Sequence, residues 1–164
     1  MYGKILVPVD GSDTSTCGLN EAIQIAKNLG GRIRLVHVVN EFIIDGSFSR
    51  GMYMNDFFES LRDTGKTILA QAEALVRQSG IEVDSALVES IGGPAADFIV
   101  AQAKQWPADL IVMGTHGRRG LARLAMGSDA EQVVRAMSVP VLVVRSAPPR
   151  RKPASQDTSI GVCV

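Results

Sequence analysis

Short apolar runs alternate with longer amphipathic stretches along most of this chain. Nearly continuous apolar runs cover residues 4–9, 33–39, 110–113 and 141–144, and a further segment at 82–88 alternates apolar and polar positions. Runs of this length that are rich in β-branched residues predict strands. Because four of the five are almost continuously apolar, we expect them to be buried on both faces of a parallel sheet.

The stretches between these runs place apolar residues three or four positions apart, which predicts amphipathic helices. The predicted stripes are Leu19, Ala22, Ile23, Ala26 and Leu29; Phe57, Leu61, Ile68, Ala72 and Leu75; Ala96, Ile99, Val100 and Ala103; and Ala130, Val133, Val134 and Met137. Gly30-Gly31 and Gly80 are expected to end the first two helices, and Pro94 suits the first turn of the third.

This alternation predicts an α/β fold, a Rossmann-like open parallel sheet of five strands with helices on both faces. In such a sheet, ligands bind beyond the carboxyl ends of the strands, where the strand order reverses. The first and fourth predicted strands both end in turn-forming loops, at residues 10–13 and 114–117. If these two strands are neighbours, the strand order is 3-2-1-4-5 and both loops face one crevice.

The loop after the fourth strand carries the strongest functional signal. It holds Gly114 and Gly117 in a Gly-x-x-Gly pattern and, after nine intervening residues, Gly127 and Ser128. Glycines permit positive φ and let backbone N–H groups approach an anion, and the following helix N-terminus favours phosphate. The alternative is that the glycines only turn the chain and that Ser128 caps the helix in a Ser-Asp-Ala-Glu capping box. The two interpretations are compatible.

Three side chains on these loops have both a functional and a structural interpretation. Asp10 could contact a ribose hydroxyl or a bridging metal ion, or it could form an Asx turn that caps the first helix. The guanidinium of Arg118 suits a phosphate but would also suit a solvated face. His116 is interpreted as a hydrogen-bonding loop residue, because no cysteine or second histidine lies near it in the sequence.

Composition narrows the classes of function. Lys+Arg and Asp+Glu both number 17, so no excess of positive charge favours a nucleic-acid partner. No apolar run reaches the roughly 18 residues of a membrane span, and the N-terminus lacks the apolar region of a signal peptide. Cys17 and Cys163 have no CxxC spacing, which argues against a disulfide framework or a zinc site. We therefore expect a cytoplasmic protein that binds neither nucleic acid nor membranes.

The last predicted strand and the segment after it lead to two further expectations. Residues 146–164 are rich in proline and charge, and they predict a disordered tail after a domain of residues 1–145. In the order 3-2-1-4-5 the fifth strand lies at a sheet edge, and Val141–Val144 carries no charge, bulge or internal proline to protect that edge. We therefore predict a homodimer through residues 140–145, with the strand paired to its own copy across a two-fold axis.

Four segments together resemble the universal stress protein family. They are the glycine pattern at 114–128, the opening ILVPVDGS at 5–12, VHVV at 36–39 and PVLVVR at 140–145. The resemblance covers residues 1–145 and implies an ATP-binding domain that dimerises through its last strand. It also implies that Pro8, Val9 and Asp10 line the adenosine end and that the backbone of Val38 and Val39 lies beside the adenine. Ribose and phosphates would be held by Gly114, Gly117, Arg118, Gly127 and Ser128.

Asp129 departs from the family pattern, which has a small or apolar residue at this place. A carboxylate suits a helix N-terminus, but it would repel a terminal phosphate unless a Mg²⁺ ion lay between them. The resemblance therefore leaves open whether ATP binds with Mg²⁺.

The resemblance implies a nucleotide-dependent switch or accessory factor in a stress response. No activated base is evident, so no catalytic residue is predicted and ATP hydrolysis would be slow at most. One alternative is an adenylyl-transferring or ATP-hydrolysing enzyme on a related fold, which would need a Ser-Gly-Gly-x-Asp-Ser loop or a His-x-Gly-His pair that the sequence lacks. Another is a nucleotide-free interaction dimer, against which the intact glycine pattern argues. A Walker A motif and a Gly-x-Gly-x-x-Gly after the first strand are also missing, which argues against dinucleotide oxidoreductase chemistry.

Overall fold

The computed structural model describes residues 2–40, 53–90, 92–115 and 126–145. Its elements are β1 (Lys4–Pro8), α1 (Asp13–Leu29), β2 (Arg32–Asn40), α2 (Tyr53–Gln78), β3 (Val83–Ser90), α3 (Ala95–Gln105), β4 (Leu110–Gly114), α4 (Ser128–Ala136) and β5 (Val141–Val144). The strands form one parallel sheet in the order β3-β2-β1-β4-β5. The predicted α/β fold and strand order are confirmed.

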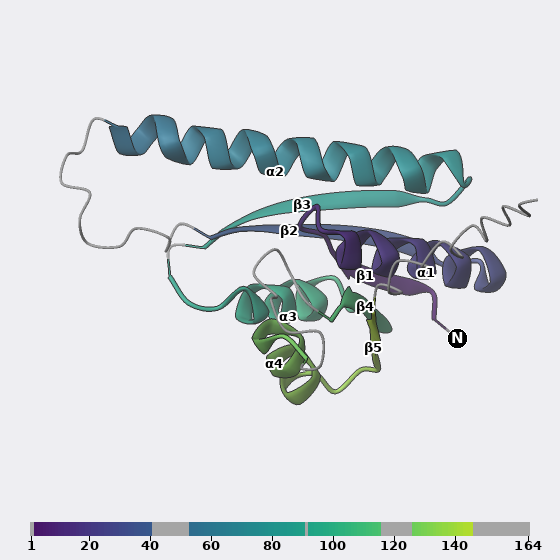
Figure 1. The fold of residues 1–164 in the computed structure, drawn as a ribbon. Coiled ribbons are helices and arrows are strands. Elements are labelled where there is room, and N and C mark those ends of the chain that lie inside the picture. The colour runs from purple at the N-terminus through teal and green to yellow at the C-terminus, as the bar shows by residue number, and fades with distance from the viewer. Residues whose placement is uncertain (1, 41–52, 91, 116–125, 146–164) are drawn as a thin grey trace, which may run out of the picture.

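Helices cover both faces of the sheet, with α1 and α2 on one face and α3 and α4 on the other (Figure 1). Side chains of β1 alternate between the two layers: Ile5 and Val7 pack with α1 and α2, and Leu6 packs with α3 and α4. All three side chains are fully buried. The predicted burial on both faces is thus confirmed for β1, and β4 is also buried, but the prediction is wrong for β5, where Leu142 is 36% exposed at the sheet edge.

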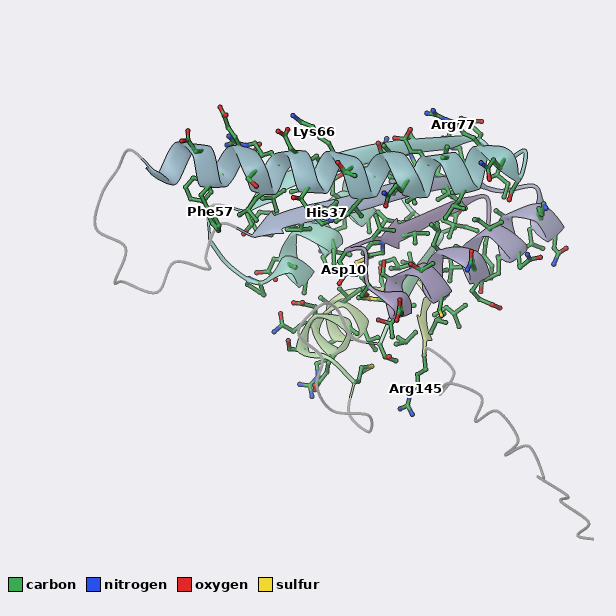
Figure 2. All side chains as sticks on the ribbon, turned by 45° about the horizontal axis from the view of Figure 1, so that its top comes forward. Asp10, His37, Phe57, Lys66, Arg77 and Arg145 are labelled. Atoms are coloured by element: carbon green, nitrogen blue, oxygen red, sulfur yellow. The ribbon has the colours of Figure 1, made fainter. Side chains whose placement is uncertain are left out.

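The apolar stripes of α2 and α4 differ from the prediction. The core face of α2 consists of Ile68, Leu69, Ala72 and Val76, whereas Phe57 and Leu75 are 45% and 42% exposed. The first turns of α2 extend beyond the ends of β2 and β3 (Figure 1), and Phe57 lies on this part of the helix (Figure 2). In α4, Val134 is likewise exposed. Helical spacing predicts which residues share a stripe, but it does not predict where the surface beneath the stripe ends.

The ends of the first three helices follow the predicted signals with one shift. Gly30 ends α1 and Gly80 follows α2, and both have positive φ, +66° and +73°. Pro94 is the N-cap of α3 rather than a residue of its first turn. In the described ranges, no helix combines the length and the apolar character needed to cross a membrane. The predicted tail at 146–164 lies outside the described residues.

Candidate functional site

A crevice lies at the carboxyl ends of β1, β2 and β4, where the strand order reverses between β1 and β4. Its apolar lining includes Val36, Val38, Ala95, Ile99, Met113 and Ala130. Its polar lining includes Asp10, Ser15, His37, Thr115 and Asp129. The adjacency of the first and fourth strands is confirmed, so the loops after these strands do share one crevice.

The crevice brings together most of the predicted site residues that the structure describes. Its lining includes Pro8, Val9, Asp10, Val38, Gly114 and Gly127. Val39 is buried beside the crevice rather than lining it, and Ser128 is exposed on the first turn of α4. Gly117 and Arg118, together with His116, lie outside the described residues.

The loop after β1 satisfies its own polar groups and caps α1. Asp10 Oδ1 accepts hydrogen bonds from the backbone N–H of Ser12 at 2.9 Å and from its hydroxyl at 2.6 Å. Ser12 is the N-cap of α1, and its Oγ accepts from the N–H of Ser15 at 3.2 Å. The Asx-turn interpretation of Asp10 is therefore confirmed, while Asp10 also lines the crevice.

The end of β1 is held by a histidine to which the sequence analysis assigned no role. The N–H of Val9 donates to the carbonyl of Val36 at 2.8 Å, and His37 Nδ1 lies 2.7 Å from the carbonyl oxygen of Val9. His37 is only 7% exposed. A histidine within an apolar strand is the signal that could have identified it, because a buried imidazole requires a hydrogen-bond partner.

Close packing, rather than an unusual backbone angle, requires a glycine at position 114. A Cβ atom at Gly114 would lie 2.8 Å from the carbonyl carbon of Thr14 and 3.0 Å from the nitrogen of Ser15. On the facing helix, a Cβ at Gly18 would lie 3.3 Å from the nitrogen of Gly114. Gly114 does not have positive φ, so the conformational reason given in the sequence analysis is wrong. This glycine lets the start of α1 pack directly on the end of β4.

The start of α4 also differs from the prediction. Gly127 is the N-cap, with φ −63° and ψ 152°, and Ser128 is the first helical residue, so the predicted cap by Ser128 is wrong. Glycine offers no side chain to accept a hydrogen bond from the first turn of the helix. The N–H of Gly127 donates to the carbonyl of Thr115 at 2.8 Å, which ties this helix start to the end of β4.

These features suit a ligand with a flat apolar part and an anionic part. The apolar lining lies between the sheet and α3, and the N-terminus of α4 carries the partial positive charge of the helix dipole. Within the described ranges, no three His, Cys, Asp or Glu side chains form a group that could hold a metal ion. Asp10 and Asp129 do both line the crevice, and Mg²⁺ commonly uses one or two carboxylates together with ligand phosphates.

Comparisons with known proteins give a consistent picture. The model of the "Universal stress protein family" matches residues 1–145. Universal stress protein MJ0531 of Methanocaldococcus jannaschii is 35% identical over 145 residues, which cover 88% of this chain and 83% of that protein. The solved structure of the hypothetical protein MJ0577 is 28% identical in sequence, and the match covers 90% of this chain and 98% of that one, with a TM-score of 0.79.

Two similar solved structures are complexes with adenine nucleotides. A universal stress protein in complex with cAMP is 25% identical, with a TM-score of 0.65 and coverage of 89% of this chain and 99% of its own. The universal stress protein from Archaeoglobus fulgidus in complex with dAMP is 26% identical, with a TM-score of 0.60 and coverage of 87% and 98%. The fold of this chain is thus the fold of proteins that hold adenine nucleotides.

Proposed function

Because the chain belongs to the universal stress protein family, we propose that its crevice binds ATP and that the protein acts as a nucleotide-dependent switch or accessory factor in the cytoplasm. The observation that carries the proposal is the composition of the crevice. An apolar lining and the N-terminus of α4, which has no side-chain cap, lie in one cavity at the reversal of strand order. The two relatives in complex with cAMP and dAMP support an adenine nucleotide as the ligand class.

The proposed contacts follow the resemblance to the family, and most of the described residues among them line the crevice. Pro8, Val9 and Asp10 would line the adenosine end, with the backbone of Val38 and Val39 beside the adenine. Gly114, Gly127 and Ser128 would contact ribose and phosphates, and Gly117 and Arg118 belong to the same proposal. The carbonyl of Thr115 already accepts from the N–H of Gly127. That bond keeps the end of β4 and the start of α4 together.

Asp129 makes a metal ion part of the proposal. Its carboxylate lies in the first turn of α4 and lines the crevice, where it would repel a terminal phosphate. A bound Mg²⁺ would supply positive charge between the two, and Asp129 or Asp10 could ligate it directly or through water. Neither residue is assigned a catalytic role, and we propose slow hydrolysis of ATP at most.

Mass spectrometry of small molecules released from the purified full chain tests this proposal. We expect an adenine nucleotide, and we expect calorimetric titration of the stripped protein with MgATP to show saturable binding. A protein that releases no nucleotide and gives no binding heat with MgATP would rule the function out.

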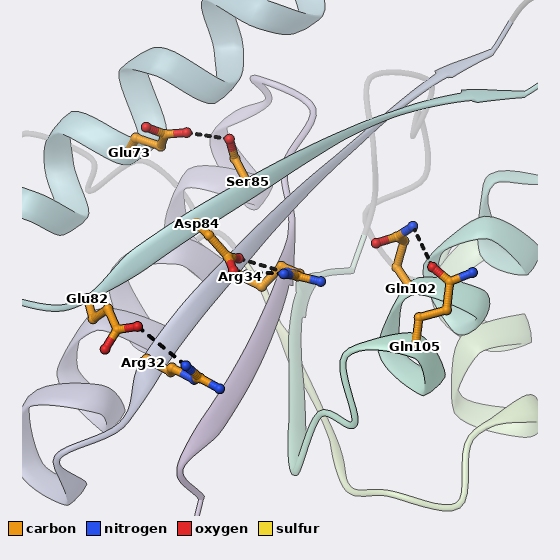
Figure 3. A network of polar contacts seen from close by, with 8 residues as sticks. All are labelled: Arg32, Arg34, Glu73, Glu82, Asp84, Ser85, Gln102 and Gln105. Carbon is orange, nitrogen blue, oxygen red and sulfur yellow. Dashed lines mark hydrogen bonds and ion pairs between the residues drawn. The ribbon is translucent and has the colours of Figure 1, made fainter.

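The two edges of the sheet differ in a way that supports the proposed dimer. At β3, charged side chains pair with neighbouring elements: Asp84 with Arg34 and Glu89 with Arg62, both at 2.7 Å, and Glu82 near the start of the strand with Arg32 at 3.4 Å. Figure 3 shows the pairs of Arg32 and Arg34. The hydrogen bond from Arg62 lowers the pKa of Glu89 and so favours its ionised form. An edge with such charges is a poor template for another strand.

The β5 edge carries valines and leucine instead. Leu142 is 36% exposed, and Val141 and Val143 are partly buried against the α3–α4 layer. We propose that two copies pair through residues 140–145. Val143→Asp should shift the dimer toward monomer in sedimentation velocity at about 20 μM, since a charged edge strand is a poor template for pairing. A wild-type protein that sediments as a monomer at this concentration would overturn the dimer, and Val134→Asp, on the exposed face of α4, is the matched control.

A further inference from the structure

His37 is a buried polar side chain to which the proposed nucleotide contacts assign no task. It lies in β2 on the face covered by α2, and Figure 2 shows it beneath this helix. Its Nδ1 atom is 2.7 Å from the carbonyl oxygen of Val9, which immediately precedes Asp10. Because a carbonyl oxygen only accepts hydrogen bonds, Nδ1 carries the proton.

This hydrogen bond lies at the step where β1 and β2 stop pairing. The last pair in their register is Pro8 with Val36, so Val9 would face His37 in the next pair. The N–H of Val9 still donates to the backbone of Val36, but its carbonyl is bonded to the imidazole instead of a backbone N–H. The two strands can therefore separate here without leaving the buried carbonyl unpaired.

Helix α2 limits where the imidazole can lie. A Cβ atom at Gly65 would be 2.7 Å from His37 Cδ2 and 2.7 Å from Leu87 Cδ1, both shorter than real Cβ contacts. His37 and Leu87 are register partners on β2 and β3. The absence of a side chain at Gly65 therefore makes room for the histidine ring, and the ring is confined between the backbone of α2 and the carbonyl of Val9.

The fixed carbonyl sets the start of the crevice loop. Val9 and Asp10 both line the crevice, and the N–H of Asp10 donates to Ser15 Oγ at 3.2 Å. Asp10 in turn orders Ser12, the N-cap of α1. A change at the Val9 carbonyl would thus move the loop proposed to line the adenosine.

We propose that His37 is a positioning residue of the crevice: its imidazole holds the carbonyl of Val9, and Gly65 keeps the imidazole in place. The nucleotide part of this inference rests on the proposed function. Its effect on the Asp10 loop does not, because that loop exists without ligand.

Substitutions at position 37 separate this role from simple core packing. His37→Phe keeps a buried ring but removes the donor. His37→Asn loses the ring but places an N–H donor on Cγ, as in Nδ1 of histidine. We expect His37→Phe to weaken MgATP binding by about tenfold, and His37→Asn to restore it to within about threefold of wild type. A packing role alone would give the opposite order, because phenylalanine fills the space better.

Gly65→Ala tests the same link from the helix. Alanine in a helix interior normally stabilises the helix, yet here its methyl group would displace the imidazole. We expect weaker binding than wild type, by about tenfold as for His37→Phe. Thr64→Ala, at an exposed neighbouring position of α2, is the control and should leave binding unchanged.

Amide hydrogen exchange of Asp10 and Ser12 in the nucleotide-free protein tests the positioning role of His37 independently of MgATP binding. In His37→Phe and Gly65→Ala, both amides should exchange at least about tenfold faster, and in His37→Asn close to the wild-type rate. Wild-type exchange in His37→Phe and Gly65→Ala would overturn the positioning role even if MgATP binds. If the wild type does not bind MgATP, the proposed function fails, while the exchange rates still test His37. If His37→Phe does not fold, the exchange rates of Gly65→Ala and His37→Asn test the positioning role in its place.

Discussion

Helices α1 and α4 both begin at the crevice, but only α1 closes its own N-terminus. Ser12 caps α1 with its hydroxyl oxygen, and Asp10 holds Ser12 through two hydrogen bonds. Helix α4 begins after Gly127, which has no side chain to cap with. The first N–H groups of any helix need partners from outside its own hydrogen-bond ladder. Among the residues that the structure describes, Ser12 supplies such a partner at α1, whereas the N-cap of α4 makes no side-chain hydrogen bond to its helix.

The two aspartates of the crevice reflect the same difference. Asp10 is engaged within its own loop, whereas Asp129 stands in the first turn of α4, where an anionic ligand would come. The start of α1 thus has a structural task, and we propose a binding task for the start of α4. Substitutions that separate stability from binding can break or sharpen this assignment.

The largest expected effect is on the contact that places α1 against β4. Gly114→Ala puts a methyl group 2.8 Å from the backbone of Thr14, which cannot yield as a flexible side chain would, so we expect a loss of about 3 kcal/mol in unfolding free energy. Gly3→Ala is the matched control, because its methyl group would meet Asp109 at an ordinary 3.6 Å. Urea denaturation measures both. Equal stabilities of the two variants would show that α1 and β4 are not packed as described.

The next effect separates the two helix starts directly. Ser12→Ala removes the α1 cap and should lower the unfolding free energy by about 1 kcal/mol, whereas Ser128→Ala removes no cap and should change it by less than about 0.5 kcal/mol. Thermal and urea unfolding of both variants provide the comparison. A larger loss from Ser128→Ala than from Ser12→Ala would restore Ser128 as the cap of α4.

The smallest effect concerns charge at the start of α4. Asp129→Asn should tighten ATP binding by about threefold when EDTA removes divalent ions, because the repulsion between carboxylate and phosphate disappears. In Mg²⁺ the advantage should vanish or reverse, since the carboxylate then faces a cation. Calorimetry with and without Mg²⁺ measures the difference. Glu131→Gln, in the same turn but paired with Arg135 at 2.6 Å, is the control and should show no dependence on Mg²⁺.

The sequence predicts the arrangement of the elements better than the contacts between them. Alternating strand and helix patterns predict the elements of the sheet because each signal is local. The strand order and the shared crevice follow only if the first and fourth strands are neighbours, which the structure confirms. The contacts of Gly114 with Thr14 and of Gly65 with His37 join segments far apart in the sequence, so no spacing rule predicts them. The exposed Phe57 has the same cause, since the helix pattern continues past the end of the sheet.

The start of α4 shows a different limit of prediction from the sequence, which concerns the boundaries of elements. The pattern Ser-Asp-Ala-Glu does occur at 128–131, but the chain places Ser128 one residue too late to serve as the cap. Boundaries of elements depend on the tertiary contacts that fix them, here the bond between Gly127 and Thr115.

Calorimetric titration of Gly127→Val with MgATP tests the binding role of the α4 start most directly. The backbone at Gly127, with φ −63° and ψ 152°, is one that valine readily adopts, so the fold should persist and the melting temperature should stay close to wild type. The added side chain would enter the space proposed for phosphate, and we expect at least about tenfold weaker binding than in wild type. A folded Gly127→Val protein that binds MgATP as tightly as wild type would contradict the account.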